Sequence, residues 1–440
     1  MSASLDFRVE WLDAPGVTTP ELAATWARYE MWVGGRCVTQ VEAADGTFRR
    51  GIYGSLYPLA YWIASNWWLL SSHVRPTAVD SRYWSWLHVR TQPWLRRHNY
   101  RGAGDGMAWP DLTVVPEGPV TQVTWRQDYE RHSGLVRFAS DGRQWLRSDD
   151  LRADLASIVG RVLDRLTEAA LPKTPLAEEW ASIAAADADE REFCETAARM
   201  GLDPYSLADD TADEIVRTAA LIPADIAPDF FDSVDVAGLA GAADWTRRAA
   251  TAAEDAANKA TREIHAISPW SSMQTLTDAW QADTERPWLI GYEMARGVRH
   301  ELALADTERF DLSPWVGIGH IAAISHGIYG LATLSHGRCG VVLGDQHAGA
   351  TARRFGQARA LGRILAQPGR REFVLSAARS QDEKVARAFA AELLAPAEGI
   401  RSALNALGSN DDNAMEAVAR RFMVSPLLVR RQYDNQLASA

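Results

Sequence analysis

The chain has 440 residues, with 47% hydrophobic residues, 23% charged residues and a formal net charge of −11. This length accommodates two or three domains with sizeable cores, and the composition is that of a globular protein rather than a disordered or fibrous one. The acidic balance gives the whole chain no general attraction to nucleic acids or to anionic membranes.

The beginning of the chain carries no targeting signal that we can identify. Its first residues, MSASLDFRVEW, lack the basic stretch and the apolar core of a signal peptide. The three cysteines, Cys37, Cys194 and Cys339, are odd in number and far apart, which does not suit a disulfide framework and fits a reducing compartment. We therefore expect a cytoplasmic protein.

Tryptophan is concentrated in the first part of the chain, where 12 of the 18 tryptophans lie in residues 1–150. Short β-prone runs and turns precede an uncharged stretch at residues 51–74, which is long enough for a membrane span. Pro58, Ser65 and Asn66 interrupt it, and its aromatic residues are not confined to the two ends. We expect a buried helix that begins at Pro58, inside a Trp-rich α/β domain at residues 1–172.

Arginine and tryptophan alternate in residues 76–110, a composition that also occurs where proteins stack on single-stranded nucleic acid. The other interpretation is a tryptophan core with arginines packed on it. The acidic balance of the chain favours the second interpretation. Further β-prone runs follow between Leu112 and Leu146, and then a helix begins near Ser148.

Residues 173–286 are rich in alanine and in charged residues, and their periodicity is almost entirely helical. The longest predicted helix, at 235–267, keeps no heptad pattern over three repeats, so we expect a helical connector rather than a coiled-coil arm. Residues 287–440 then form a third region. The predicted fold class is therefore multidomain α+β.

Histidines in the third region have to be tested as metal ligands. The pair His300-Glu301 begins like a zinc-peptidase signature, but Leu304 stands at the position of the second histidine, which indicates a solvated helix end. Residues 317–327 look helical and are followed by two strands. Four histidines lie in this part without i, i+4 spacing, so a metal site would have to combine them with Glu383: His320, His326, His336 and His347.

Two helical runs, separated by a Pro-Gly break and a short β-prone run, make up residues 353–396. They resemble the paired helices of the ImmA/IrrE-like metallopeptidase family. The residues that match the first family motif are Arg354, Phe355, Ala358, Leu361 and Gly362. The residues that match the second are Glu383, Ala386, Phe389, Ala390, Ala391, Glu392, Leu393, Leu394 and Pro396.

The resemblance implies the peptidase fold, but the residues that carry its chemistry differ. Arg359 and Arg363 stand at the two histidine positions of the zinc motif, and Ala360 replaces the general base. Arginine has no lone pair for a metal, so we expect no zinc and no catalytic residues. Only Glu383 matches a family ligand. Either Arg359, Arg363 or both pair with Glu383 and brace the two helices in place of the metal, or the arginines line an anion-binding cleft.

The last segment has the spacing of a helix-turn-helix, with Ser425 as the cap of the second helix and Pro426 at its first position. Residues 348–440 hold 14 Lys and Arg against nine Asp and Glu, so this end is basic within an acidic chain. If the segment binds DNA, the contacts are expected from Arg430, Arg431 and Gln432.

By resemblance, we expect a catalytically degenerate module that binds a protein partner, such as a repressor or another regulator, in a bacterial stress, mobile-element or phage-defence response. Two alternatives remain. One is a transcriptional regulator that binds DNA through the C-terminal helix pair. The other is a divergent metallopeptidase with non-standard ligands. No cofactor and no membrane association are expected.

Overall fold

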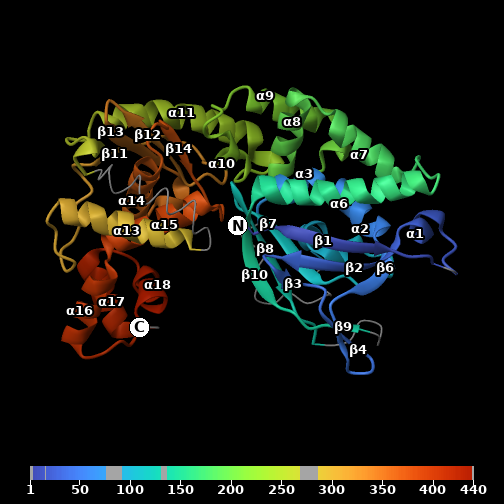
Figure 1. Ribbon diagram of the computed structural model, residues 1–440. Coiled ribbons are helices and arrows are strands. Elements are labelled where there is room, and N and C mark those ends of the chain that lie inside the picture. The colour runs from blue at the N-terminus through green and yellow to red at the C-terminus, as the bar shows by residue number, and fades with distance from the viewer. Residues whose placement is uncertain (1–2, 15, 76–91, 130–135, 268–285, 439–440) are drawn as a thin grey trace. The chain divides into compact units, whose positions relative to one another are not determined.

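The computed structural model describes residues 3–14, 16–75, 92–129, 136–267 and 286–438. The protein is of mixed α+β class, with about 51% of its residues in helices and 17% in strands that form several small, mostly antiparallel sheets. It divides into two compact units, Met1–Leu207 and Ala208–Ala440 (Figure 1). This division falls inside the predicted connector at 173–286, whose helices are shared between the two units.

The N-terminal unit packs short sheets against helices. Its strands are β1 (Leu5–Trp11), β2 (Trp26–Val33), β3 (Arg36–Cys37), β4 (Val41–Ala43), β5 (Phe48–Arg49), β6 (Ile52–Ser55), β7 (Asp111–Pro116), β8 (Val120–Arg126), β9 (Val136–Phe138) and β10 (Gly142–Arg147). Its helices are α1 (Pro20–Ala24), α2 (Tyr57–Ser65), α3 (Trp67–Ser72), α5 (Pro93–His98), α6 (Ser148–Glu168), α7 (Pro175–Ala185) and α8 (Ala188–Arg199). All strand pairs in this unit are antiparallel.

The uncharged stretch near residues 51–74 forms two short helices rather than the single helix that was expected. Helix α2 ends at Ser65, Asn66 breaks the run, and α3 begins at Trp67. Trp62, Trp67 and Trp68 are buried in the core of the unit, as the sequence predicts. Among the described residues, no helix is both long enough and apolar enough to cross a membrane.

Of the Arg/Trp stretch, residues 76–91 lie outside the described part of the chain. In its described remainder, Trp94 and Trp109 are buried. Arg101 donates to Asp128, and Arg97 donates to the carbonyl of Gly201. These side chains therefore serve as core and core-edge contacts, which fits the second interpretation of the stretch.

A pair of histidines sits in the core beside Trp94. Nδ1 of His98 lies 3.0 Å from the carbonyl oxygen of Val114, which can only accept, so Nδ1 carries the proton. Nε2 of His98 is then an acceptor, and Nδ1 of His73 donates to it at 3.3 Å. This chain of hydrogen bonds requires a neutral His98, because its Nε2 must keep a lone pair. His73 is kept neutral by burial, which, helped by Arg97, lowers its pKa to about 4.

We expect this histidine pair to make the N-terminal unit acid-sensitive. An unfolded histidine has a pKa of about 6.5 and takes up a proton there, whereas folded His73 stays neutral down to about pH 4. The free energy of unfolding should therefore fall by about 3 kcal/mol for His73 between pH 6.5 and pH 4, since each pKa unit is worth ~1.4 kcal/mol. Urea unfolding of wild type and His73→Gln at several pH values checks this. A pH dependence that is the same in both proteins would contradict it.

The C-terminal unit is built around one four-stranded sheet. Its helices are α9 (Asp209–Ala219), α10 (Ala227–Phe231), α11 (Leu239–Ala257), α13 (Pro287–Glu301), α14 (Ala350–Ala366), α15 (Gln381–Leu394), α16 (Ala397–Leu407), α17 (Asp412–Phe422) and α18 (Pro426–Gln436). Its strands are β11 (Val316–Gly319), β12 (Gly330–Ser335), β13 (Arg338–Leu343) and β14 (Glu372–Leu375), in the spatial order β11-β13-β12-β14. Only the β11–β13 pair is parallel among these.

Helix α11 covers one face of this sheet and α14 the other (Figure 1). The alanines of α11 approach the sheet backbone so closely that a Cβ on Gly317 would lie 1.8 Å from the carbonyl oxygen of Ala256. Gly340 is equally close to the carbonyl oxygen of Ala253. The Ala-rich helix is thus a packed layer of the unit. The predicted helix at 317–327 is wrong, because its glycines let strand β11 pass under α11.

Candidate functional site

Helices α14 and α15 bring the family-like residues together. Arg359 and Arg363 are one turn apart on α14, so they project toward the same side. Helix α15 begins after Ser380, whose hydroxyl accepts from the backbone N–H of Glu383. Arg359, Arg363 and Glu383 are all buried, with side-chain exposures of 3%, 1% and 0%. Ala360 is also buried, in the apolar core behind them.

Arg359 forms an ion pair with Glu383. Its Nη2 donates to Oε2 of Glu383 and also lies 2.7 Å from the carbonyl oxygen of Ser376. The other carboxylate oxygen of Glu383 accepts from the backbone N–H of Ser376 at 2.9 Å. Burial acts to raise the pKa of Glu383, but the guanidinium of Arg359, helped by those of Arg387 and Arg363, outweighs it and lowers the pKa. Glu383 is therefore an ionised and well-paired carboxylate.

Arg363 forms its ion pair with another carboxylate, that of Asp229. Its Nη2 donates to Oδ2 of Asp229 at 2.6 Å, and its Nη1 lies 3.5 Å from Oδ2 of Asp382. Burial opposes the charge of Arg363, yet Asp229, followed by Asp382 and Glu383, raises its pKa overall. Asp229 comes from α10 and also has Arg370 3.4 Å away. Of the two arginines expected to pair with Glu383, singly or together, Arg359 does so and Arg363 pairs with Asp229 instead.

These side chains do not fit a zinc ion. Both guanidiniums are donors only, and the two oxygens of Glu383 already accept hydrogen bonds. In the described part of the chain, no three His, Cys, Asp or Glu side chains are grouped so as to hold a metal ion. The alternative prediction, an anion-binding cleft lined by Arg359 and Arg363, is wrong. Both side chains are buried, and each forms an ion pair with a carboxylate of the protein.

The histidines that were tested as ligands do not converge. His320, His326 and His336 are exposed, and His347 is buried. Burial, and then the charge of Arg359, lowers the pKa of His347 to about 4. His300 and Glu301 lie exposed at the end of α13, as predicted for a solvated helix end.

Glu392 is a second buried acidic residue of α15 that sequence reasoning assigned no role. Its Oε1 accepts from Nε of Arg296 on α13 at 3.0 Å. Its Oε2 accepts from the side-chain amides of Gln432 and Gln436 on α18, each at 2.9 Å. Glu392 thus ties three helices together. The only sign of this role in the sequence is that Glu392 stands in an apolar helical run, where a buried charged residue needs partners.

The C-terminal helices α17 and α18 have the expected helix-turn-helix form. Met423 takes a left-handed conformation in the turn, and the Ser425 hydroxyl accepts from the N–H of Leu428 at 3.2 Å to cap α18. Arg431 is exposed, and Arg430 is exposed but pairs with Asp412. The prediction that Gln432 faces DNA is wrong, because it is 2% exposed and bonded to Glu392.

No protein-family model, curated protein or solved structure matches this chain. The contacts of α14 and α15 form an ionic cluster in which Arg359, Arg363 and Glu383 are buried, and this cluster ties α10, α14 and α15 together.

Proposed function

We propose that this protein is a catalytically degenerate, ImmA/IrrE-like module that regulates by binding a protein partner. The observation that carries the proposal is the buried Arg359–Glu383 pair at the positions where the resembling family holds its metal. The pair keeps α14 and α15 joined without a metal and leaves no hydrolytic group at position 360. A domain that keeps its fold but lacks the hydrolytic group can still bind another protein through its surface.

A partner-capture experiment tests this proposal. The full chain, tagged at its N-terminus and expressed in its own cells, should retain a specific protein that is recovered at full length. The same purified chain should release no peptides from that protein on long incubation. Time-dependent cleavage that stops with a chelator would instead favour the divergent metallopeptidase, and absence of any specific partner would remove the regulatory proposal.

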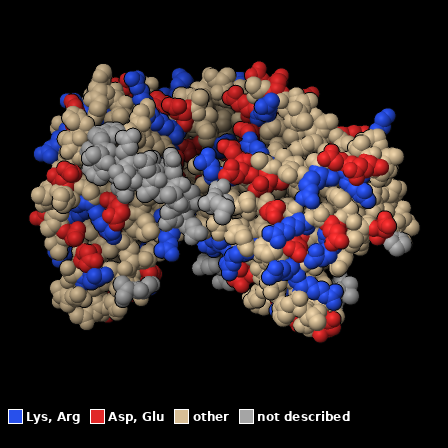
Figure 2. Space-filling model, in the orientation of Figure 1, with Lys and Arg blue, Asp and Glu red and all other residues tan. Residues whose placement is uncertain are grey.

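DNA binding is the second candidate, because Ser425-capped α18 carries the exposed Arg430 and Arg431. Two observations weaken it: Arg430 already pairs with Asp412, and basic and acidic side chains are interspersed on the face drawn in Figure 2. A protein that neutralises few phosphates binds DNA weakly and with a shallow salt dependence.

For the double variant Arg430→Ala/Arg431→Ala, we expect any duplex binding to weaken by a similar factor for every DNA sequence and its salt dependence to become flatter. The reason is that phosphate contacts carry affinity but no sequence information. Fluorescence anisotropy with two unrelated duplexes at several salt concentrations measures this. The matched control is Arg420→Ala/Arg421→Ala on α17. Unchanged binding in the Arg430/Arg431 variant would place the DNA contact elsewhere.

A further inference from the structure

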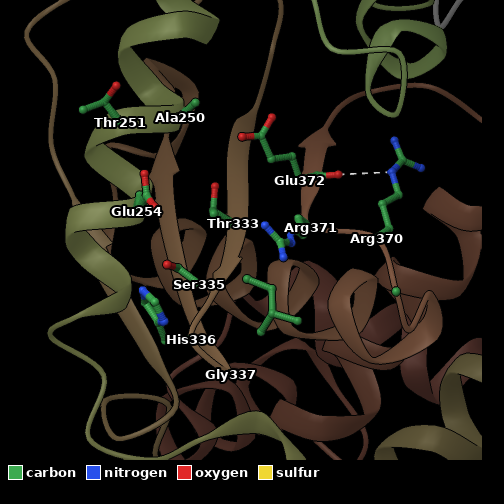
Figure 3. Close-up of a pocket in the computed structure, with 12 residues that line it drawn as sticks. Ala250, Thr251, Glu254, Thr333, Ser335, His336, Gly337, Arg370, Arg371 and Glu372 are labelled. Atoms are coloured by element: carbon green, nitrogen blue, oxygen red, sulfur yellow. Dashed lines mark hydrogen bonds between the residues drawn. The ribbon is translucent and has the colours of Figure 1, made fainter.

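A cavity of about 780 Å³ lies in the C-terminal unit; it shares Arg370 with the ionic cluster but is lined by none of Arg359, Arg363 and Glu383 (Figure 3). Helix α11 forms one wall of it, and the end of β12 and the start of β14 form the floor and the other wall. Its volume is in the range of sites for small ligands. Its polar lining includes Thr251, Glu254, Thr333, His336, Arg371 and Glu372.

The floor of the cavity contains a hydroxyl group without a partner. Thr333 on β12 is directly opposite Glu372 on β14 in the antiparallel register, so both side chains project from the face of the sheet that α11 covers. Thr333 is 7% exposed, and its Oγ1 makes no hydrogen bond within the described chain. Buried hydroxyls are normally satisfied, so this one can take part in a hydrogen bond with a group bound in the cavity.

Two carboxylates line the same cavity from different elements. Glu254 projects from α11 and Glu372 from β14 (Figure 3). Burial, and then the charges of Glu254 and Asp225, raises the pKa of Glu372. In the described structure, neither Glu254 nor Glu372 forms an ion pair with Lys, Arg or His. A bound cation would relieve this repulsion.

The cavity also contains a guanidinium that is not used elsewhere. The guanidinium of Arg370 is already hydrogen-bonded within the protein. Its Nε donates to the carbonyl of Glu372 at 3.1 Å, and its Nη1 donates to the side chain of Gln367 at 3.1 Å. Arg371 is exposed on the cavity lining, and no carboxylate of the described residues pairs with it. The cavity thus offers acceptors for a cation and a two-donor fork for an anion.

We propose that this cavity binds a free amino acid, with its ammonium group held by Glu254, Glu372 and the Thr333 hydroxyl and its carboxylate held by Arg371. An ammonium group has three N–H donors, and these side chains provide three acceptor groups. The guanidinium fork matches a carboxylate through two parallel hydrogen bonds. This inference goes beyond the proposed partner binding and does not depend on it.

Thermal unfolding of the full chain with each of the twenty common amino acids, at about 10 mM, is the first measurement, because a ligand of the folded state raises the unfolding midpoint. We expect at least one amino acid to do so and to give a saturable calorimetric titration. Its amide, which lacks the carboxylate, and its deamino analogue should each bind at least tenfold more weakly, or about 1.4 kcal/mol. No shift with any amino acid, or equal binding of either analogue, overturns the proposal.

Three variants locate the site: Thr333→Val, Arg371→Gln and Glu372→Gln. Each should weaken binding at least about tenfold, since each removes one group that the ligand needs. Thr333→Val is the sharpest, because its hydroxyl has no partner in the protein and its loss should not lower the unfolding midpoint without ligand. Arg353→Gln and Glu398→Gln, both exposed and outside the cavity, are the matched controls. Wild-type affinity in all three cavity variants overturns the assignment.

Discussion

Arg359→Met should lower the free energy of unfolding by about 3–5 kcal/mol, the cost of leaving a buried charge without its partner. Glu383 is fully buried, and its ionised form depends on Arg359 first among its neighbours. Ser376 would still donate to one carboxylate oxygen, but it supplies no positive charge, and the half-buried Arg387 would remain 3.8 Å from the other oxygen, too far for a hydrogen bond. Urea denaturation followed by circular dichroism measures the change. Because a typical domain is stable by only about 5–15 kcal/mol, the effect is large.

The double variant Arg359→Met/Glu383→Gln is the decisive companion. It removes both charges and keeps the oxygen that accepts from Ser376. Its loss in free energy of unfolding should therefore be about 1–3 kcal/mol smaller than the summed losses of the two single variants. Arg353→Met on the same helix is the control, because its exposed guanidinium donates to the carbonyl of Ala348 and forms no ion pair with any described carboxylate. It should change stability by less than about 0.5 kcal/mol. Additive effects of the two single substitutions would show that the pair does not brace the helices.

Local patterns in the sequence predicted the elements of this site well. The periodicity of residues 353–366 and 381–394 and the spacing of Arg359 and Arg363 placed both arginines on one side of α14. A pairing of Glu383 with at least one of these arginines also followed from the sequence, because a buried carboxylate needs a cation, but the sequence did not say which arginine it is. These inferences depend only on helix geometry and on charge.

The partner of Arg363 could not be predicted in the same way. Asp229 is 134 residues away in the sequence and lies on the five-residue helix α10, whose periodicity is too short to assign a face. The role of α11 was hidden for a related reason. A helix rich in alanine shows no clear alternation of apolar and polar positions, so its buried face is hard to predict. The close approach of α11 to the sheet backbone at Gly317 and Gly340 shows why small residues are needed there. The burial of Gln432 could not be predicted either, because its partner Glu392 is 40 residues away in the sequence.

Replacing both arginines with imidazoles should create a metal site. In Arg359→His/Arg363→His, the new side chains would be one turn apart on α14 and face Glu383, the ligand set of a zinc peptidase. Asp229, released from Arg363, lies next to the second position. We expect about one equivalent of zinc per chain in the tag-free variant by elemental analysis, and little in the wild type, whose guanidiniums cannot coordinate it.

The metal-free form of this variant should be much less stable than the wild type, since Glu383 and Asp229 lose their charged partners. Zinc at about 100 times its dissociation constant should restore roughly 2.7 kcal/mol, which separates metal binding from non-specific damage. Adding Glu383→Gln to the variant removes a ligand and should abolish tight binding while leaving both imidazoles in place. A folded variant that binds no zinc would show that α14 and α15 do not have the geometry of a metallopeptidase. Stoichiometric zinc in the wild type, lost on Glu383→Gln, would overturn the brace and favour a divergent metalloenzyme.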